Sequence, residues 1–172
     1  MSGSSVPVLL DNCAISACCE VGAWNALCGY FDLETVEQVA SEAATGASHR
    51  EIIDPTEFRS QVTVHNVSRK ARLEKQAEFA ELANLDDGER DLWVHALDRT
   101  GSWILCGPDT ASIRFGVRAG HGDKLISLEE LFRRMGYTPK KTLKSHQTSV
   151  WLRARISEFS TELAFEALAR KK

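Results

Sequence analysis

The chain of 172 residues lacks the sequence features that mark several large classes of protein. It contains no apolar run close to the ~18 residues of a membrane-spanning helix, and no basic-then-apolar leader at its start. Internal repeats and low-complexity linkers are absent as well. The net charge of −3 provides no overall attraction to nucleic acid, so such binding would require a local basic patch or metal ions. We expect no membrane partner and a compact globular fold.

The cysteines lack the spacing of a metal site or of a disulfide framework. Five is an odd number, and Cys13, Cys18, Cys19 and Cys28 do not form the paired short spacings of a zinc site. Cysteines on the apolar face of a helix usually behave as small core residues. The pattern therefore predicts reduced cysteines and a cytoplasmic location.

Short apolar runs alternate with helical stripes along the chain. Strands that are separated by helices indicate βαβ units, so we predict an α/β fold with a mainly parallel sheet. The predicted strands cover residues 6–10, 31–33, 61–67, 102–106 and 124–127. The predicted helices cover residues 12–28, 36–44, 68–83, 88–100, 109–119, 128–135 and 147–172, with a further helix beginning at Asp54.

The last predicted helix has an apolar stripe with spacings of four, three, four and four residues. The stripe consists of Leu152, Ile156, Phe159, Leu163 and Ala167. One interpretation is a terminal helix packed on its own domain. The other is an arm that binds a second copy of the chain, giving a homo-oligomer, or binds another partner.

Four acidic residues stand out by their positions. Asp11 and Asp109 each follow a predicted buried strand, and ligands of open parallel sheets bind at the carboxyl ends of strands. Glu89 lies at a predicted helix start, and Glu42 lies within a predicted helix. Hard cations such as Mg²⁺ and Mn²⁺ prefer oxygen ligands, and a cluster of acids at one sheet edge can hold such an ion for phosphodiester cleavage.

Each of these acids also has a purely structural interpretation. Asp11 and Asp109 could simply cap the helices that follow them. Glu89 could complement a helix dipole, and Glu42 could be a solvated surface residue. The neighbours of Glu89 are close enough to take its place in the site; these are Asp86, Asp87 and Asp91.

The order of these motifs resembles the PIN-domain family of metal-dependent ribonucleases, which includes the toxins of bacterial toxin–antitoxin pairs. The similarity begins with a first strand that ends in Asp11 and a helix that carries Glu42. It continues with the helix start at Gly88-Glu89 and the strand that ends at Asp109, and it closes with a strand and helix over residues 124–131. Together these motifs cover residues 6–136 as a PIN-like domain, and residues 137–172 form a C-terminal helical extension.

The resemblance implies an α/β/α sandwich with about five parallel strands in the order 3-2-1-4-5. It further implies a Mg²⁺ or Mn²⁺ site whose ligands are Asp11, Glu89 and Asp109. Glu42 would be a further ligand or would orient water, and Asn12 would be a small polar residue near the metal and the substrate. The implied activity is endoribonucleolytic cleavage, with RNA as substrate and an antitoxin protein as a partner.

Two other functions remain open at this stage. A PIN-like domain that does not cleave would be an RNA-binding or protein-interaction module, using the terminal helix and the basic stretch that begins at Lys140. A cysteine hydrolase would use Cys106 as nucleophile with Asp11 as its helper. That mechanism requires an exposed cysteine at a helix start, where its pKa would fall.

Overall fold

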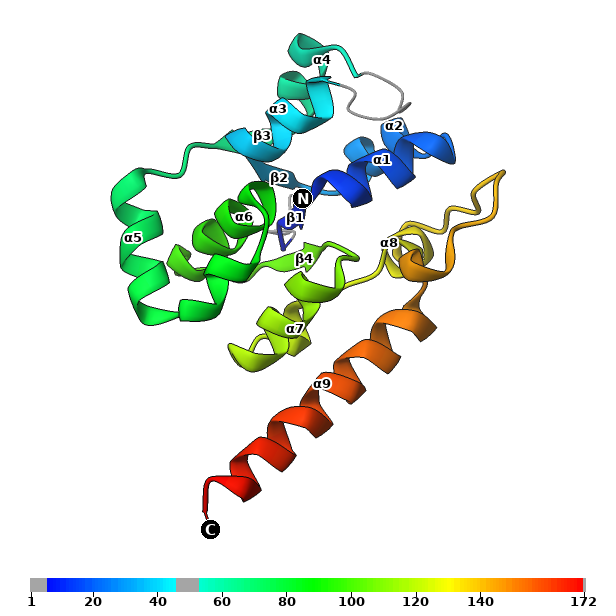
Figure 1. Ribbon diagram of the computed structural model, residues 1–172. Helices are drawn as coiled ribbons and strands as arrows, with labels where there is room; N and C mark the ends of the chain where they lie inside the picture. The colour runs from blue at the N-terminus through cyan, green and yellow to red at the C-terminus, as the bar shows by residue number, and fades with distance from the viewer. Residues whose placement is uncertain (1–5, 46–52, 172) are drawn as a thin grey trace.

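A parallel sheet of four short strands lies at the centre of the molecule (Figure 1). The computed structural model describes residues 6–45 and 53–171. The strand order is β3-β2-β1-β4, and all three pairings are parallel. Val8 pairs with Leu33 on one side and with Ile104 on the other, so β1 lies inside the sheet. The strands are β1 (Val8–Leu10), β2 (Leu33–Val36), β3 (Thr63–His65) and β4 (Ile104–Cys106).

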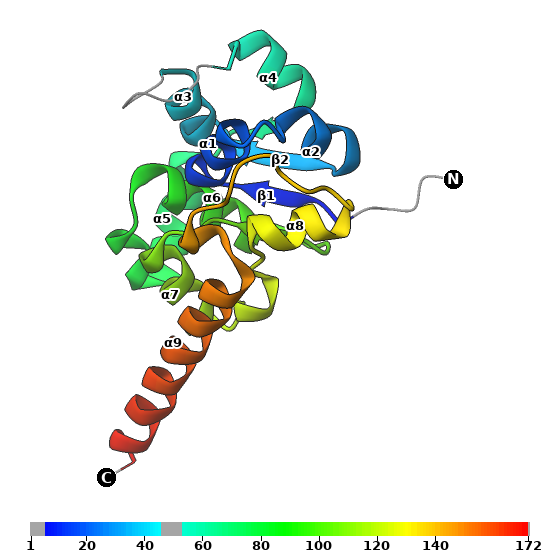
Figure 2. The ribbon, with the colours of Figure 1, turned by 90° about the vertical axis from the view of Figure 1, so that its right-hand side faces the viewer.

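Helices cover both faces of this sheet. Figures 1 and 2 show α1, α2 and α8 on one face and α5 and α6 on the other. The Tyr30 hydroxyl donates to the carbonyl of Arg134 at 3.0 Å, which links α2 to the end of α8. The α-helices are α1 (Asn12–Glu20), α2 (Trp24–Tyr30), α3 (Glu37–Thr45), α4 (Pro55–Gln61), α5 (Arg69–Glu78), α6 (Asp87–Asp98), α7 (Thr110–Arg118), α8 (Leu128–Arg134) and α9 (Ser149–Ala169). Three short 3₁₀ helices are η1 (Ala80–Asn84), η2 (Gly122–Lys124) and η3 (Ser145–Gln147).

The predicted α/β class and parallel sheet are confirmed, but the fifth strand is reduced to one bridge. Within the described ranges, the segment predicted at 124–127 makes a single parallel bridge, between Leu105 and Leu125. The Ile126 amide also donates to the Leu105 carbonyl at 3.0 Å. The segment is short because η2 ends at Lys124 and Ser127 already caps α8. The observed order agrees with the first four positions of the predicted 3-2-1-4-5 arrangement.

The single helix predicted over residues 12–28 is wrong, because the structure divides it into α1 and α2. Gly22 has a φ of 70°, a left-handed conformation that glycine adopts at little cost. The Ala23 amide donates to the Cys18 carbonyl, and the Gly22 amide donates to the Cys19 carbonyl. These two bonds form the helix-ending pattern that places glycine just after the last turn. The apolar pattern continues through the break, which is why periodicity alone did not reveal it.

The first half of α9 packs on α7, as one of the two interpretations of the terminal stripe expects. Leu152 and Phe159 are buried in a small cluster with Ile113 and Val117 of α7. The second half extends away from the body of the domain in both views (Figures 1 and 2). Its apolar side chains include Phe165, which is 67% exposed. No described helix, α9 included, is both long and apolar enough to cross a membrane.

The contact between α6 and α7 depends on a glycine. Trp93 of α6 is fully buried, and its indole N–H donates to the Ser112 hydroxyl at 2.8 Å. A Cβ atom at Gly116 of α7 would lie 2.8 Å from two ring carbons of Trp93. The two helices can therefore approach this closely only because position 116 has no side chain.

We predict that Gly116→Ala destabilises the protein. Relative to a glycine-to-alanine change at an open helical position, which gains up to ~1 kcal/mol of helix propensity, the overlap with the buried Trp93 ring should cost about 1–3 kcal/mol. This loss corresponds to a fall of roughly 2–12 °C in melting temperature for a domain of this size. Gly29→Ala in α2 is the matched control, because no atom lies within 4 Å of its Cβ position. Equal melting temperatures for the two variants in calorimetry would contradict this account.

Candidate functional site

Asp11 lies where β1 ends and α1 begins. It is buried, with an exposed fraction of 4%, and its Oδ1 accepts a hydrogen bond from the Ala14 amide at 2.7 Å. Its own amide donates to the Cys106 carbonyl of β4 at 3.2 Å, which continues the β1–β4 pairing. A Cβ atom at Gly107 would lie 3.0 Å from Asp11 Oδ2, so this glycine lets the end of β4 approach the carboxylate. Asp11 is thus a helix cap, and it also faces the neighbouring strand end.

Asp109 occupies the corresponding position between β4 and α7. Its Oδ1 accepts from the Ala111 amide at 2.7 Å and from the Ser112 amide at 3.3 Å. The cap interpretation is therefore correct for Asp109 as well as for Asp11. Because β1 and β4 are parallel neighbours, both capping carboxylates lie at the same edge of the sheet. Capping fixes the position of each carboxylate. Whether the two carboxylates also form a shared site depends on the residues around them.

Glu89 brings a third carboxylate to this edge from the first turn of α6. The pKa of Glu89 is raised to about 9, first by burial and then by the negative charges of Asp109, Asp86 and Asp11. A hydrogen bond between the side chains of Glu89 and Asp109 acts in the same direction. This pKa favours a protonated Glu89 carboxyl group at neutral pH. The charges of Asp11 and Asp109 act on Glu89, but the ligand atoms of these three acids do not all lie within 4.8 Å of one another. Their role as a shared metal site therefore stays a prediction; we call them, with Asp86, the acid cluster.

Asp86 is a member of this cluster that was assigned only as a substitute for Glu89. It caps α6, and its Oδ1 accepts from the Glu89 amide at 2.8 Å. Its charge raises the pKa of both Glu89 and Glu42. The signal available in the sequence was its position as an N-cap, three residues before a glutamate. Asp86 therefore joins the cluster beside Glu89 and does not replace it.

Glu42 of α3 lies beside the start of α6, on the other side of Asp86. Both of its carboxylate oxygens would be 3.1 Å from a Cβ atom at Gly88. Burial raises the pKa of Glu42 and the charges of Asp86 and Asp87 add to this, while a 3.2 Å hydrogen bond from Gln38 opposes it. Glu42 is therefore a half-buried neighbour of the acid cluster, and the interpretation as a solvated surface residue is wrong.

The remaining acids near Glu89 form ion pairs with arginines. Asp91 is buried and accepts two hydrogen bonds from Arg72, at 2.5 and 2.6 Å. Asp87 is exposed and pairs with Arg90, one turn along α6. Asn12, the first residue of α1, has a buried Oδ1 atom for which the described residues provide no hydrogen-bond partner. Asp91 and Asp87 therefore stabilise the fold around the cluster.

The cysteine-hydrolase hypothesis is wrong. Cys106 is only 1% exposed. Burial raises the pKa of its thiol well above the usual range, and the charge of Asp11 acts in the same direction. A nucleophilic cysteine requires an accessible thiolate, and Asp11 makes that form less stable here.

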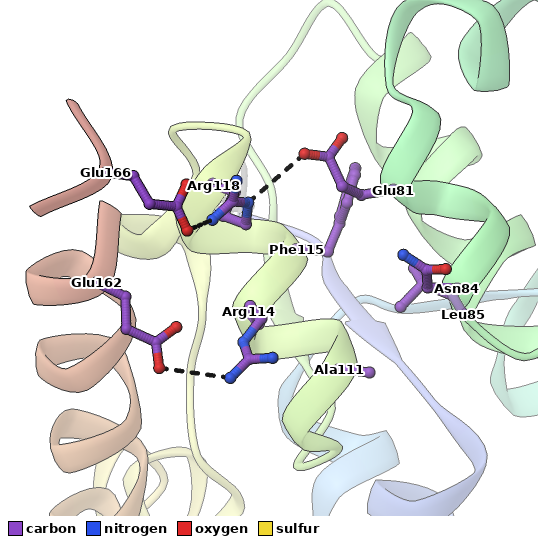
Figure 3. A pocket seen from close by; sticks show the side chains of 9 residues that line it. All are labelled: Glu81, Asn84, Leu85, Ala111, Arg114, Phe115, Arg118, Glu162 and Glu166. Atoms are coloured by element: carbon purple, nitrogen blue, oxygen red, sulfur yellow. Dashed lines mark hydrogen bonds and ion pairs between the residues drawn. The ribbon is translucent and has the colours of Figure 1, made fainter. Parts of the chain in front are cut away.

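A groove with a volume of about 470 Å³ lies along α7, between η1 and α9 (Figure 3). It begins beside Leu85, which precedes Asp86, and Ala111, whose amide binds Asp109. Arg118 lies between Glu166 of α9, at 2.9 Å, and Glu81 of η1, at 3.5 Å. Arg114 reaches Glu162 at 3.5 Å. Arg114 belongs to the motif that follows Asp109 in the sequence, whereas Arg118 could not be selected there, because its partners depend on how α9 packs.

Comparison with known proteins identifies no relative. No family model, no curated protein sequence and no solved structure matches the chain. The resemblance to the PIN-domain family therefore stays a prediction from the sequence motifs. A function for this chain has to be inferred from its own residues.

We predict that the metal-free protein becomes less stable than its Glu89→Gln variant as the pH rises. In the unfolded chain the carboxyl group loses its proton near pH 4.5, whereas in the folded protein its pKa is about 9. Between these values the folded state binds more protons, so stability falls as pH increases, by at most ~1.4 kcal/mol per pH unit.

Thermal melts of both proteins in chelator, from pH 5 to pH 8.5, measure this difference. Glu89→Gln cannot ionise, so its advantage in melting temperature should grow by several degrees across the range. Other titrating groups are common to both proteins and cancel in the difference. Two curves that stay parallel would mean that Glu89 does not hold a proton in the folded protein.

Proposed function

We propose that this protein is a metal-dependent ribonuclease with a PIN-like active site. The observation that carries the proposal is the acid cluster, in which burial, followed by the charges of carboxylates at the ends of β1 and β4 and at the start of α6, raises the pKa of Glu89 to about 9. Such repulsion costs stability unless a proton or a cation relieves it. Functional sites are where arrangements of this kind are concentrated.

The residues fit a hard divalent cation. Asp11, Glu89 and Asp109 offer oxygen atoms, the ligands that Mg²⁺ and Mn²⁺ prefer. The buried Asn12 Oδ1, without a described hydrogen-bond partner, is one more oxygen next to Asp11 in the chain. A Mg²⁺ or Mn²⁺ ion held by these carboxylates would supply positive charge for the phosphate and would lower the pKa of water.

The chain's own groups have distinct roles in this proposal. Asp11 and Asp109 are held by backbone N–H groups, so their carboxylates are positioned before any ligand arrives. Glu89 must release its proton to act as a ligand, which ties cation binding to pH. Glu42, with its raised pKa, lies near enough to Asp86 to accept or return a proton beside the site.

The groove along α7 provides a path for a polyanion. Arg114 and Arg118 line it, and Leu85 and Ala111, which also line it, are chain neighbours of Asp86 and of the residue after Asp109. Guanidinium groups bind phosphates through paired hydrogen bonds, and their present carboxylate partners are side chains that a phosphate can replace. The resemblance to the PIN-domain family extends the proposal to RNA as the substrate and to an antitoxin protein as a binding partner.

Cleavage of single-stranded RNA should require Mg²⁺ or Mn²⁺ and each of the three central acids. Asp11→Asn, Glu89→Gln and Asp109→Asn should each reduce cleavage by more than about 100-fold, since removal of one electrostatic group in a catalytic site commonly costs that much. Chelator should abolish cleavage by the wild type. Asp98→Asn is the matched control, because Asp98 lies exposed at the opposite end of α6.

The same assay separates the alternatives. RNA that is bound but not cleaved under any metal condition would favour the non-cleaving interaction module. Cleavage that persists in chelator and in Asp11→Asn would exclude the metal mechanism. Folding of each variant is checked by circular dichroism, so loss of structure is not mistaken for loss of chemistry.

RNA affinity should increase when the glutamates that pair with the groove arginines are neutralised. Glu162→Gln with Glu166→Gln removes the α9 carboxylates beside Arg114 and Arg118 and leaves Glu81 as the carboxylate partner of Arg118. Surface pairs of this kind contribute little to stability. Fluorescence anisotropy with labelled single-stranded RNA in chelator measures affinity without cleavage. The salt dependence of binding should steepen as well.

A control of equal net charge is Glu74→Gln with Glu158→Gln, at surface sites outside the groove. Arg118→Ala should weaken binding. If both double variants bind RNA equally well, the gain reflects net charge, and the groove is not the RNA path.

A further inference from the structure

A second group of metal-ligating side chains lies within the sheet, apart from the acid cluster. Glu34 of β2, His65 of β3 and His95 of α6 offer ligand atoms that all lie within 4.8 Å of one another. Glu34 Oε2 is 2.8 Å from His65 Nε2 and 3.4 Å from His95 Nε2. In the described part of the chain, no other set of three such residues meets this distance.

The parallel register explains why these three residues meet. Glu34 lies opposite Thr63, and His65 follows two residues later, so both side chains are on the same face of the sheet. Helix α6 covers that face and supplies His95 (Figure 1). Glu34 is buried, with a 7% exposed fraction, between β1 and β3. A carboxylate at such a position requires positively charged or hydrogen-bonding partners.

Arg99 now provides the positive charge at the centre of this group. Its Nη1 contacts Glu34 Oε2 and lies 3.2 Å from His95 Nε2. Burial raises the pKa of Glu34, but the hydrogen bond and charge of Arg99 and the charge of His65 outweigh this and lower it. The guanidinium group is incompletely satisfied, because its Nε atom is buried and has no hydrogen-bond partner among the described residues.

His95 Nε2 faces two groups of opposite hydrogen-bonding character. A guanidinium group only donates, so Nε2 is the acceptor in the 3.2 Å contact with Arg99, whereas in the 3.4 Å contact with Glu34 Oε2 it can only be the donor. Burial lowers the pKa of His95, and the charge of His65 lowers it further. The contact with Arg99 favours a neutral imidazole with its lone pair on Nε2, which is also the form that binds metals.

We propose that Glu34, His65 and His95 form a Zn²⁺ site and that Arg99 is its displaceable occupant. Two imidazoles and one carboxylate, with water in the fourth position, are a zinc donor set, whereas Mg²⁺ and Mn²⁺ prefer the all-oxygen acid cluster. Zn²⁺ binding releases the proton of His65 Nε2, and Arg99 swings outward. The side chain of His65 is 32% exposed, so the ion enters the site from the solvent beside His65.

Binding also requires one imidazole ring to turn. The rings of His65 and His95 are stacked, with centroids 4.1 Å apart and an angle of 23° between their planes. Two nearly parallel rings cannot both direct an in-plane lone pair at one ion between them. Departure of Arg99 from His95 Nε2 leaves room for this rotation. The bound ion then joins β2, β3 and α6, so it should stabilise the fold independently of any RNA chemistry.

Zn²⁺ titration of the full chain, followed by calorimetry and thermal melts, tests the site, with Co²⁺ as a spectroscopic probe. The wild type should bind Zn²⁺ and show a Co²⁺ absorption spectrum of tetrahedral nitrogen and oxygen ligation. His65→Gln and His95→Gln should each weaken Zn²⁺ binding by more than about 10-fold, the scale of loss seen when even a supporting group is removed. Arg99→Met should bind Zn²⁺ more tightly than the wild type, because no guanidinium group must leave.

Two controls make the outcome specific. His121→Gln removes a histidine that contacts Trp103 and should leave Zn²⁺ binding unchanged. In Asp11→Asn the Co²⁺ spectrum of nitrogen and oxygen ligation should persist, so an ion bound at the acid cluster is distinguished from one bound here. If Arg99→Met fails to fold, the imidazole ¹⁵N shifts of His65 and His95 in the wild type report the same event. Zn²⁺ affinity that is indifferent to both histidines, or no Zn²⁺ binding, would overturn the proposal and leave a buried ion pair.

Discussion

The burial of β1 is the constraint on which the rest of the structure depends. All three of its residues are completely buried, and the strand pairs with β2 on one side and β4 on the other. Parallel neighbours require crossover connections, and these connections supply the helices that cover both faces. The same pairing brings the chain segments after β1 and after β4 to one edge. Asp11 and Asp109 meet there because of the topology, whatever chemistry they perform.

The molecule buries carboxylates in two places and neutralises them in different ways. At the acid cluster the neighbours of Glu89 are other carboxylates, so Glu89 keeps a proton. Inside the sheet Glu34 stays ionised, because Arg99 and His65 lower its pKa against the effect of burial. Burying an unpaired, ionised carboxylate would lower the stability of the fold by several kcal/mol, so the charge has to be neutralised at each place. In our proposals, a hard cation binds at the first place, and at the second a metal ion held by the histidine nitrogens replaces the guanidinium group.

The features that could be predicted from the sequence are those encoded by neighbouring residues. The first and fourth strands were predicted because each is a short apolar run that ends shortly before an aspartate. The parallel order then brought Asp11 and Asp109 together. The group formed by Glu34, His65 and His95 was missed, because its members are far apart in the chain and meet only through strand register and the packing of α6. The turn at Gly22 was missed because the apolar pattern is the same on both sides of it.

The contact between α7 and α9 combines strong apolar packing with weak ion pairs. This difference in strength determines which of these contacts a ligand in the groove can replace. Burial of Phe159 and Leu152 holds α9 in place, since a buried apolar side chain contributes about 1.5–3 kcal/mol. The pair of Arg114 with Glu162 is exposed and contributes at most about 1 kcal/mol. Arg114 also stacks on the Phe159 ring, 4.6 Å from its centroid, so the apolar contact positions the guanidinium group without its carboxylate partner. A polyanion can therefore replace the glutamate while α9 stays attached and the arginine stays in place.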